Sequence, residues 1–89
     1  MNKDEALKLV KENGLNLKNL SDDFKKDREI VLAAVKNDGF AIADADSKFL
    51  DDKEIAIEAV KNNKHTLLLL SKRLTEDKDI IDLVEKKQT

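Results

Sequence analysis

Residues 27–39 read DREIVLAAVKNDG, and residues 52–64 read DKEIAIEAVKNNK, which repeats the same order of residue types 25 positions later. Each stretch opens on an Asp whose side chain can accept hydrogen bonds from the first free amides of a helix. An acid follows two positions on, and a Lys stands near the end, as the helix dipole favours. The apolar residues between them recur at the spacing of one helix face. Each stretch therefore predicts one amphipathic helix that begins just after Asp27 or Asp52.

The same pattern extends along the whole chain. Three aspartates and one asparagine share the first position of the repeat: Asn2, Asp27, Asp52 and Asp77. One lysine recurs nine positions later in every unit: Lys11, Lys36, Lys61 and Lys86. Valine recurs at Val10, Val35 and Val60. A fixed period of this length is the signature of a stacked repeat array, so the chain divides into units at about residues 2–26, 27–51, 52–76 and 77–89.

A shorter helix is predicted after each long one. Gly14 and Gly39 follow the first two long helices, where a left-handed glycine commonly ends a helix. The short helices are expected at about residues 15–20, 41–45 and 66–70, each followed by a loop that carries Phe24, Phe49 or Leu74. The predicted fold is all-α: one small domain of stacked repeats, with four longer helices alternating with three shorter ones.

The two stretches at residues 27–39 and 52–63 resemble a known repeat. Their order of cap, acid, aliphatic residues, alanine, valine and lysine is similar to the bacterial and protist family called domain of unknown function 4116. The likeness covers about half of the chain strongly. It departs at Lys64, where the family has glycine, and in the first unit. The resemblance implies a helical repeat of bacterial type, often a module in larger proteins, and it assigns no catalytic residue.

Composition restricts the function classes. The 89 residues are 40% charged and 40% hydrophobic, with a formal net charge of −2 and no cysteine. Thiolate metal sites and disulfides are therefore excluded. No apolar run, the four leucines at residues 67–70 included, approaches the roughly 20 residues of a membrane span. The N-terminus has acids where a signal peptide has a basic region. We expect a soluble cytoplasmic protein.

No catalytic or metal motif stands out. His65 is the only histidine, and a zinc site there would need three carboxylates beside it. Asp44 and Asp46 begin like a calcium loop, but Lys48 and Phe49 occupy positions that need a ligand and a glycine. Acid pairs precede helices, where capping and the helix dipole explain them. We expect no enzyme activity, no cofactor and no metal.

Three functions remain open. The first is protein–protein interaction with an unknown partner, because repeat arrays present one continuous binding face. The alternative is nucleic-acid binding, in which Lys11, Lys36, Lys61 and Lys86 would follow a phosphate backbone along one edge. Two observations argue against it. Tyr and Trp, which would stack on bases, are absent, and lysines near helix C-termini are already explained by the helix dipole. The third is self-association through the ends of the array.

Equivalent positions of the repeat, called columns below, also predict which side chains are buried. Ala34 and Ala59 are expected at close helix–helix contacts, and Phe24, Phe49 and Leu74 in the core. One column is polar only in the first unit, at Glu5, and another only in the last, at Asp82. We expect these two to be exposed at the ends of a complete, capped and mostly monomeric array. The apolar members of the same columns are expected to be buried between units: Ile30, Ile55, Leu32 and Ile57.

Overall fold

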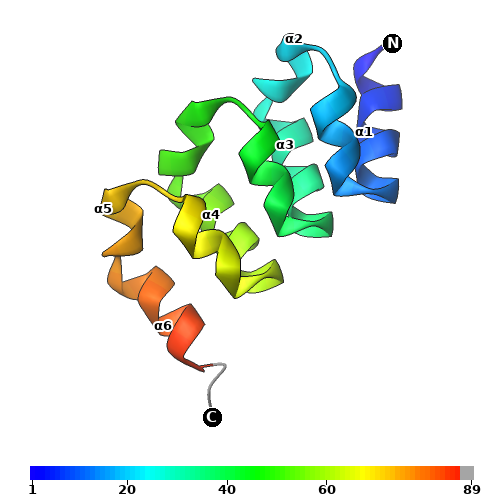
Figure 1. The fold of residues 1–89 in the computed structure, drawn as a ribbon. Helices are drawn as coiled ribbons and strands as arrows, with labels where there is room; N and C mark the ends of the chain where they lie inside the picture. The colour runs from blue at the N-terminus through cyan, green and yellow to red at the C-terminus, as the bar shows by residue number, and fades with distance from the viewer. Residues whose placement is uncertain (87–89) are drawn as a thin grey trace.

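The computed structural model describes residues 1–86, except the Lys86 side chain, and is an elongated all-α array measuring 42 × 24 × 15 Å. Its long helices are α1 (Lys3–Glu12), α3 (Arg28–Asn37), α4 (Lys53–Asn62) and α6 (Lys78–Lys86). Figure 1 shows them side by side in one layer, with short helices packed in front and the two termini at opposite ends. The long helices begin 25 residues apart, as the repeat columns predict.

Two short helical elements follow each of the first three long helices. The first is a 3₁₀-helix: η1 (Gly14–Asn19), η2 (Gly39–Asp44) and η4 (Lys64–Leu69). The second is a single turn: α2 (Asp22–Lys25), η3 (Ser47–Asp51) and α5 (Lys72–Thr75). The prediction of a plain loop at these last positions is therefore wrong, and the 3₁₀-helices begin one or two residues earlier than expected. Side-chain caps favour two of these turns: Asp46 accepts a hydrogen bond from the Lys48 amide, and the Ser71 hydroxyl accepts one from the Leu74 amide. Ser21, at the start of α2, makes no such bond.

The predicted helix caps are confirmed. Asp27 accepts hydrogen bonds from the amides of Glu29 and Ile30, and Asp52 accepts one from the amide of Ile55. In the first unit, the Asn2 side chain accepts from the Glu5 amide at 2.9 Å, while the Asn2 amide donates to the Glu5 carboxylate at 3.0 Å. Glu5 thus completes a capping box, which gives it a local role besides its exposed position.

The role predicted for the glycines is wrong. No glycine in the described residues has a positive φ, so neither Gly14 nor Gly39 ends its helix in the left-handed conformation. Instead, a Cβ added at Gly14 would lie 2.2 Å from the carbonyl oxygen of Ala34, and one at Gly39 would lie 2.7 Å from that of Ala59. Glycine is needed because the next unit's long helix passes directly against these backbones.

Ile30, Ile55, Ala34 and Ala59 have no exposed surface, so the predicted close contacts of the two alanines are confirmed. Glu5 and Asp82 are exposed, as expected. Leu32 and its equivalent Ile57 are only half-buried, so the prediction that they are buried between units is wrong for these two residues. Leu32 instead lines a groove on the surface of the long helices.

Two of the three side chains predicted to lie in the core from the single-turn elements are buried. Phe49 and Leu74 are buried, with 3% and 0% of their surfaces exposed, but Phe24 is only half-buried. The amides of Asp46 and Ser71 donate to the carbonyls of Lys25 and Leu50 in the preceding unit, at 3.0 and 2.9 Å. These bonds hold η3 and α5 against the unit before them. Phe24 lies in the first unit, where no preceding repeat in this structure covers it.

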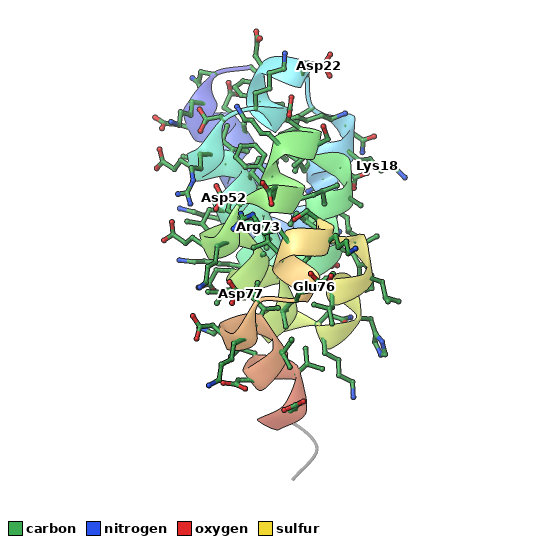
Figure 2. The ribbon with its side chains drawn as sticks, turned by 90° about the vertical axis from the view of Figure 1, so that its left-hand side faces the viewer. Lys18, Asp22, Asp52, Arg73, Glu76 and Asp77 are labelled. Atoms are coloured by element: carbon green, nitrogen blue, oxygen red, sulfur yellow. The ribbon has the colours of Figure 1, made fainter. Side chains whose placement is uncertain are left out.

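Units two and three are also joined by side chains. The Ser71 hydroxyl and the Arg73 guanidinium both donate to the Asp51 carboxylate, at 2.7 and 2.9 Å. Figure 2 views the array from the left-hand side of Figure 1 and shows Arg73 above Glu76 and Asp77. The single-turn elements therefore contribute to the stacking of units as well as to the chain reversal between them.

Enlarging Ala59 should destabilise the array. Ala59→Leu would add volume to a side chain that has no exposed surface, next to the backbone of Gly39. We expect the free energy of unfolding to fall by about 1–3 kcal/mol, measured by urea denaturation followed by circular dichroism. Ala43→Leu, at an exposed position, is the control. Equal stability of the two variants would contradict the close contact.

Candidate interaction site on the long-helix face

The capping ends of neighbouring long helices are joined by ion pairs. The Lys3 ammonium lies 3.1 Å from the Asp27 carboxylate and 2.9 Å from that of Glu29, in the next unit. The same arrangement recurs between the following helices, in which Arg28 bridges Asp52 and Glu54, and Lys53 bridges Asp77 and Asp79. Each basic residue at the start of a helix therefore bridges two acids of the next helix and offsets half of their charge. In Figure 2, Asp52 and Asp77 lie one below the other along this edge.

These contacts favour the charged carboxylates. Burial tends to raise the pKa of Asp52, but hydrogen bonds from Arg28 and the Ile55 amide outweigh it and hold that pKa below its usual value. At Asp77, the hydrogen bond from Lys53 is the main cause of a lowered pKa. The pKa of Arg28 is raised by its hydrogen bonds to Asp52 and Glu54. The edge formed by these helix starts, the capping edge, is thus linked by ion pairs and keeps a net negative charge, because one basic residue faces two acids between each pair of helices.

Stability should depend on these carboxylates in acid. Because the pKa of Asp52 is lower in the folded chain, its contribution is present above the unfolded pKa, about 3.9, and is lost as the pH falls through the folded value. We expect the melting temperature to be level near neutral pH and to fall below about pH 4. Asp52→Asn keeps a capping residue, like Asn2, but removes the charge. Its melting temperature should decline less steeply in acid; an identical pH profile would contradict the role of the pair.

The opposite ends of the long helices carry the predicted lysines. Lys11, Lys36 and Lys61 are all exposed. Lys61 lies 3.8 Å from Glu58 on its own helix. Within residues 1–86, no ion pair or hydrogen bond involves the ammonium groups of Lys11 and Lys36. Lys86 is the last residue of α6, and its side chain lies outside the described part of the chain. Lys11 and Lys36 therefore carry positive charge that no acid within residues 1–86 pairs with, whereas the basic residues of the capping edge are paired.

Two asparagines, Asn37 and Asn62, for which the sequence pattern predicted no role, fix the spacing of these helix ends. The Asn37 side chain accepts a hydrogen bond from the Gly14 amide at 2.7 Å and donates to the Lys11 carbonyl at 3.1 Å. Asn62 makes the equivalent bonds to the Gly39 amide and the Lys36 carbonyl. Each asparagine thus satisfies two backbone groups of the preceding unit. Their common position in the repeat is the signal that could have revealed this role.

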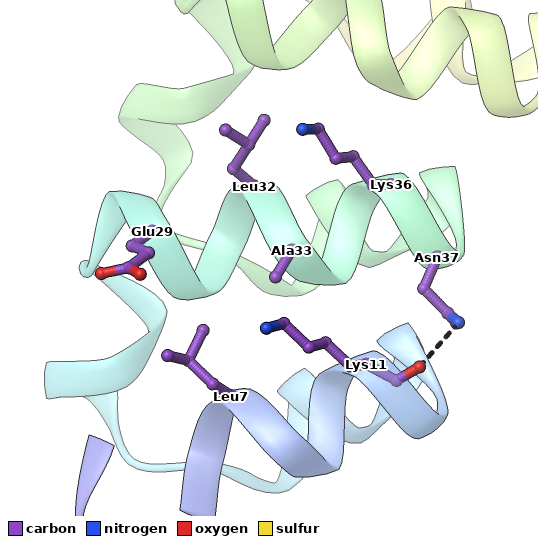
Figure 3. A pocket seen from close by; sticks show the side chains of 7 residues that line it. All are labelled: Leu7, Lys11, Glu29, Leu32, Ala33, Lys36 and Asn37. Carbon is purple, nitrogen blue, oxygen red and sulfur yellow. Dashed lines mark hydrogen bonds between the residues drawn. The ribbon is translucent and has the colours of Figure 1, made fainter. Parts of the chain in front are cut away.

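A groove of about 430 Å³ extends from α1 over the outer face of α3. Figure 3 shows Leu7 and Lys11 extending from α1 toward Ala33, with Leu32 and Lys36 on the far side of α3. Glu29 lies at the capping end, and Asn37 at the other end bonds to the Lys11 carbonyl. The groove therefore has an aliphatic floor, a paired acid at one end and lysines at the other. All its lining residues are Leu7, Lys11, Glu29, Leu32, Ala33, Lys36 and Asn37.

One residue distinguishes this groove from its counterpart between α3 and α4. Ala33 on α3 corresponds to Glu58 on α4, at the same position of the repeat. The small methyl group of Ala33 leaves space above α3. The longer Glu58 side chain is half-buried and carries a carboxylate close to Lys61. An open aliphatic floor beside uncompensated lysines is therefore a property of the first groove.

The other candidate positions offer less. His65 is exposed at the start of η4, where its amide donates to the Asn63 side chain. Across residues 1–86 there is no group of three histidine or acidic side chains arranged to hold a metal ion. Exposed apolar side chains on the short helices, Leu15, Phe40 and Leu68, line none of the described pockets. Single exposed apolar residues of this kind are common on protein surfaces.

The fold and its face are those of a tandem helical repeat, in which each unit contacts its neighbours through the same positions. A family model described as domain of unknown function (DUF4116) matches residues 2–50 and again residues 52–84. The chain belongs to this family. The expected resemblance is thereby confirmed, and both halves of the array match the same description.

No curated protein and no solved structure matches the chain. Among the helices of the described part, none combines the length and apolar character that crossing a membrane requires.

Proposed function

We propose that this chain is a non-catalytic protein-interaction module, which binds a segment of a partner protein across α1 and α3. The observation that carries the proposal is the groove between these helices, with its aliphatic floor and the uncompensated Lys11 and Lys36. A helical repeat array holds such a face rigidly, because every unit is fixed by its neighbours. The groove lining offers no nucleophile with a base beside it, and its carboxylate, Glu29, is bonded to Lys3.

Ala33→Glu tests this proposal. The substitution places in α3 the residue that α4 already carries at Glu58, so the helix should form normally while the groove is filled. Ala43→Glu, at an exposed position on η2, makes the same chemical change away from the groove. In a pull-down from the native cell, a specific partner should be retained by the wild type and by Ala43→Glu but lost by Ala33→Glu. Equal retention by all three proteins would refute the assignment of the groove.

Nucleic-acid binding is the second candidate, and the common exposed edge formed by Lys11, Lys36 and Lys61 favours it. Binding of this kind releases counterions, so its affinity falls steeply with salt. The acidic residues of the capping edge lie on the same helices and would repel a phosphate backbone. Filter binding of a single-stranded oligonucleotide at low and moderate salt tests this candidate. Salt-sensitive retention would support it, and no retention at low salt would remove it.

A further inference from the structure

We infer that the partner segment is an extended acidic peptide that carries two carboxylates three residues apart, with an aliphatic side chain between them. This inference rests on the proposed function and specifies the chemistry of the partner at the same groove. It follows from three features of the α1–α3 surface: the sign of its charge, the separation of its lysines and the size of its apolar floor.

The charge expected of the bound segment follows from which charged side chains of the groove already have ion-pair partners. At the capping edge, Glu29 is already bonded to Lys3 of the preceding helix. At the other edge, Lys11 and Lys36 have no charged partner within residues 1–86, and both line the groove. A bound segment would therefore gain attraction by placing carboxylates over these two ammonium groups. A basic segment would be repelled by the same two lysines.

The separation of the lysines is set by the packing of the helices. The ion pairs join helix starts and the Asn37 bond joins helix ends, so α1 and α3 run parallel. Packed helix axes lie about 8–10 Å apart, and Lys11 and Lys36 occupy equivalent positions on them. A polyproline-type chain has three residues per turn and rises about 3.1 Å per residue. Its first and fourth side chains therefore lie on one face, about 9 Å apart, which matches the two lysines.

The apolar floor suits one anchoring side chain. A volume of about 430 Å³ over Leu7, Leu32 and Ala33 accommodates an aliphatic group and the adjoining backbone. A bound amphipathic helix would need a row of apolar anchor sites along its length, and the lysines limit this floor on one side. In the next groove, Glu58 takes the place of Ala33 and would repel the carboxylates. The segment should therefore bind across α1 and α3 and not across α3 and α4.

A fluorescein-labelled synthetic peptide containing Glu-Leu-Ser-Glu tests the inference by fluorescence anisotropy with the full chain. We expect measurable binding that weakens with salt and drops about tenfold when both glutamates become glutamines or when the serine is deleted. Lys11→Gln and Lys36→Gln should each weaken binding by about two- to fivefold, the range for exposed ion pairs. Lys18→Gln removes the same charge from η1 and should leave the affinity unchanged. In Figure 2, Lys18 lies on the side of the array opposite Asp52.

Equal affinity for the glutamine peptide, or equal losses in Lys18→Gln and Lys11→Gln, would overturn the inference. Binding of a single-stranded oligonucleotide in place of the peptide would overturn it as well. If no peptide binds but Ala33→Glu still loses the cellular partner, this inference fails while the proposed interaction function stands. If Ala33→Glu retains every partner, the proposed function fails independently of the peptide result.

Discussion

Phe49→Ala should cost about 3–5 kcal/mol of unfolding free energy, the usual range for removing a buried aromatic ring. Only 3% of the Phe49 surface is exposed, and its ring extends from η3 into the hydrophobic core. A chain of this size has a total stability of roughly 5–15 kcal/mol, so the variant should lose a large part of its stability. Urea denaturation followed by circular dichroism measures the loss.

Phe24→Ala is the matched control, because it makes the same change at the half-buried equivalent in the first unit. Its loss of stability should be clearly smaller than that of Phe49→Ala. Near-normal stability of Phe49→Ala, combined with lost partner binding, would instead show that the aromatic residues form a binding face. Equal losses at both positions would contradict the difference in burial.

Gly14→Ala should lower the unfolding free energy by about 2–3 kcal/mol, near the upper end for overpacked sites. The added Cβ would lie 2.2 Å from the Ala34 carbonyl oxygen and 3.1 Å from the Asp38 amide nitrogen, both backbone atoms. No side-chain rotation relieves such a clash, so α3 must move away from α1. That movement would also lengthen the hydrogen bond between the Gly14 amide and Asn37.

Lys64→Ala supplies the comparison, since Lys64 occupies the same position of the repeat and already carries a Cβ. It should change the stability by less than about 0.5 kcal/mol, as exposed substitutions usually do. Thermal unfolding of both variants measures the contrast. If Gly14→Ala is as stable as the wild type, the close approach of α3 is not what requires glycine.

Local signals were sufficient to predict the long helices. An Asp or Asn cap, an acid two positions later and a Lys near the end act within a single helix, through hydrogen bonds and the dipole of that helix. The structure confirms the caps at Asp27 and Asp52. The same columns indicated close packing at Ala34 and Ala59, because small residues recur where helices approach. These features depend on neighbours in sequence or on the repeat itself.

The glycines and the single-turn elements were predicted wrongly because local signals are ambiguous there. An Asn-Gly pair after a helix is compatible with a left-handed end, but Asn13 instead caps η1 by accepting from the Leu15 amide. The reason for Gly14 is the Ala34 carbonyl oxygen, which belongs to the next unit. Sequence spacing alone does not report such an approach of two backbones.

The candidate site, too, was predicted only in part from the sequence. The lysine column was identified from the sequence, but its neighbours in space were not. That Lys11 is uncompensated while Lys3 is paired depends on which side chains of the next helix face it. The groove depends on Ala33 being small beside Leu7, a relation between two helices. The sequence by itself thus determined the helices, their caps and their period, since these follow from interactions within a unit. The tertiary structure alone decided the asparagine bonds, the need for glycine, the exposure of Phe24 and the groove, because each arises only where two units meet.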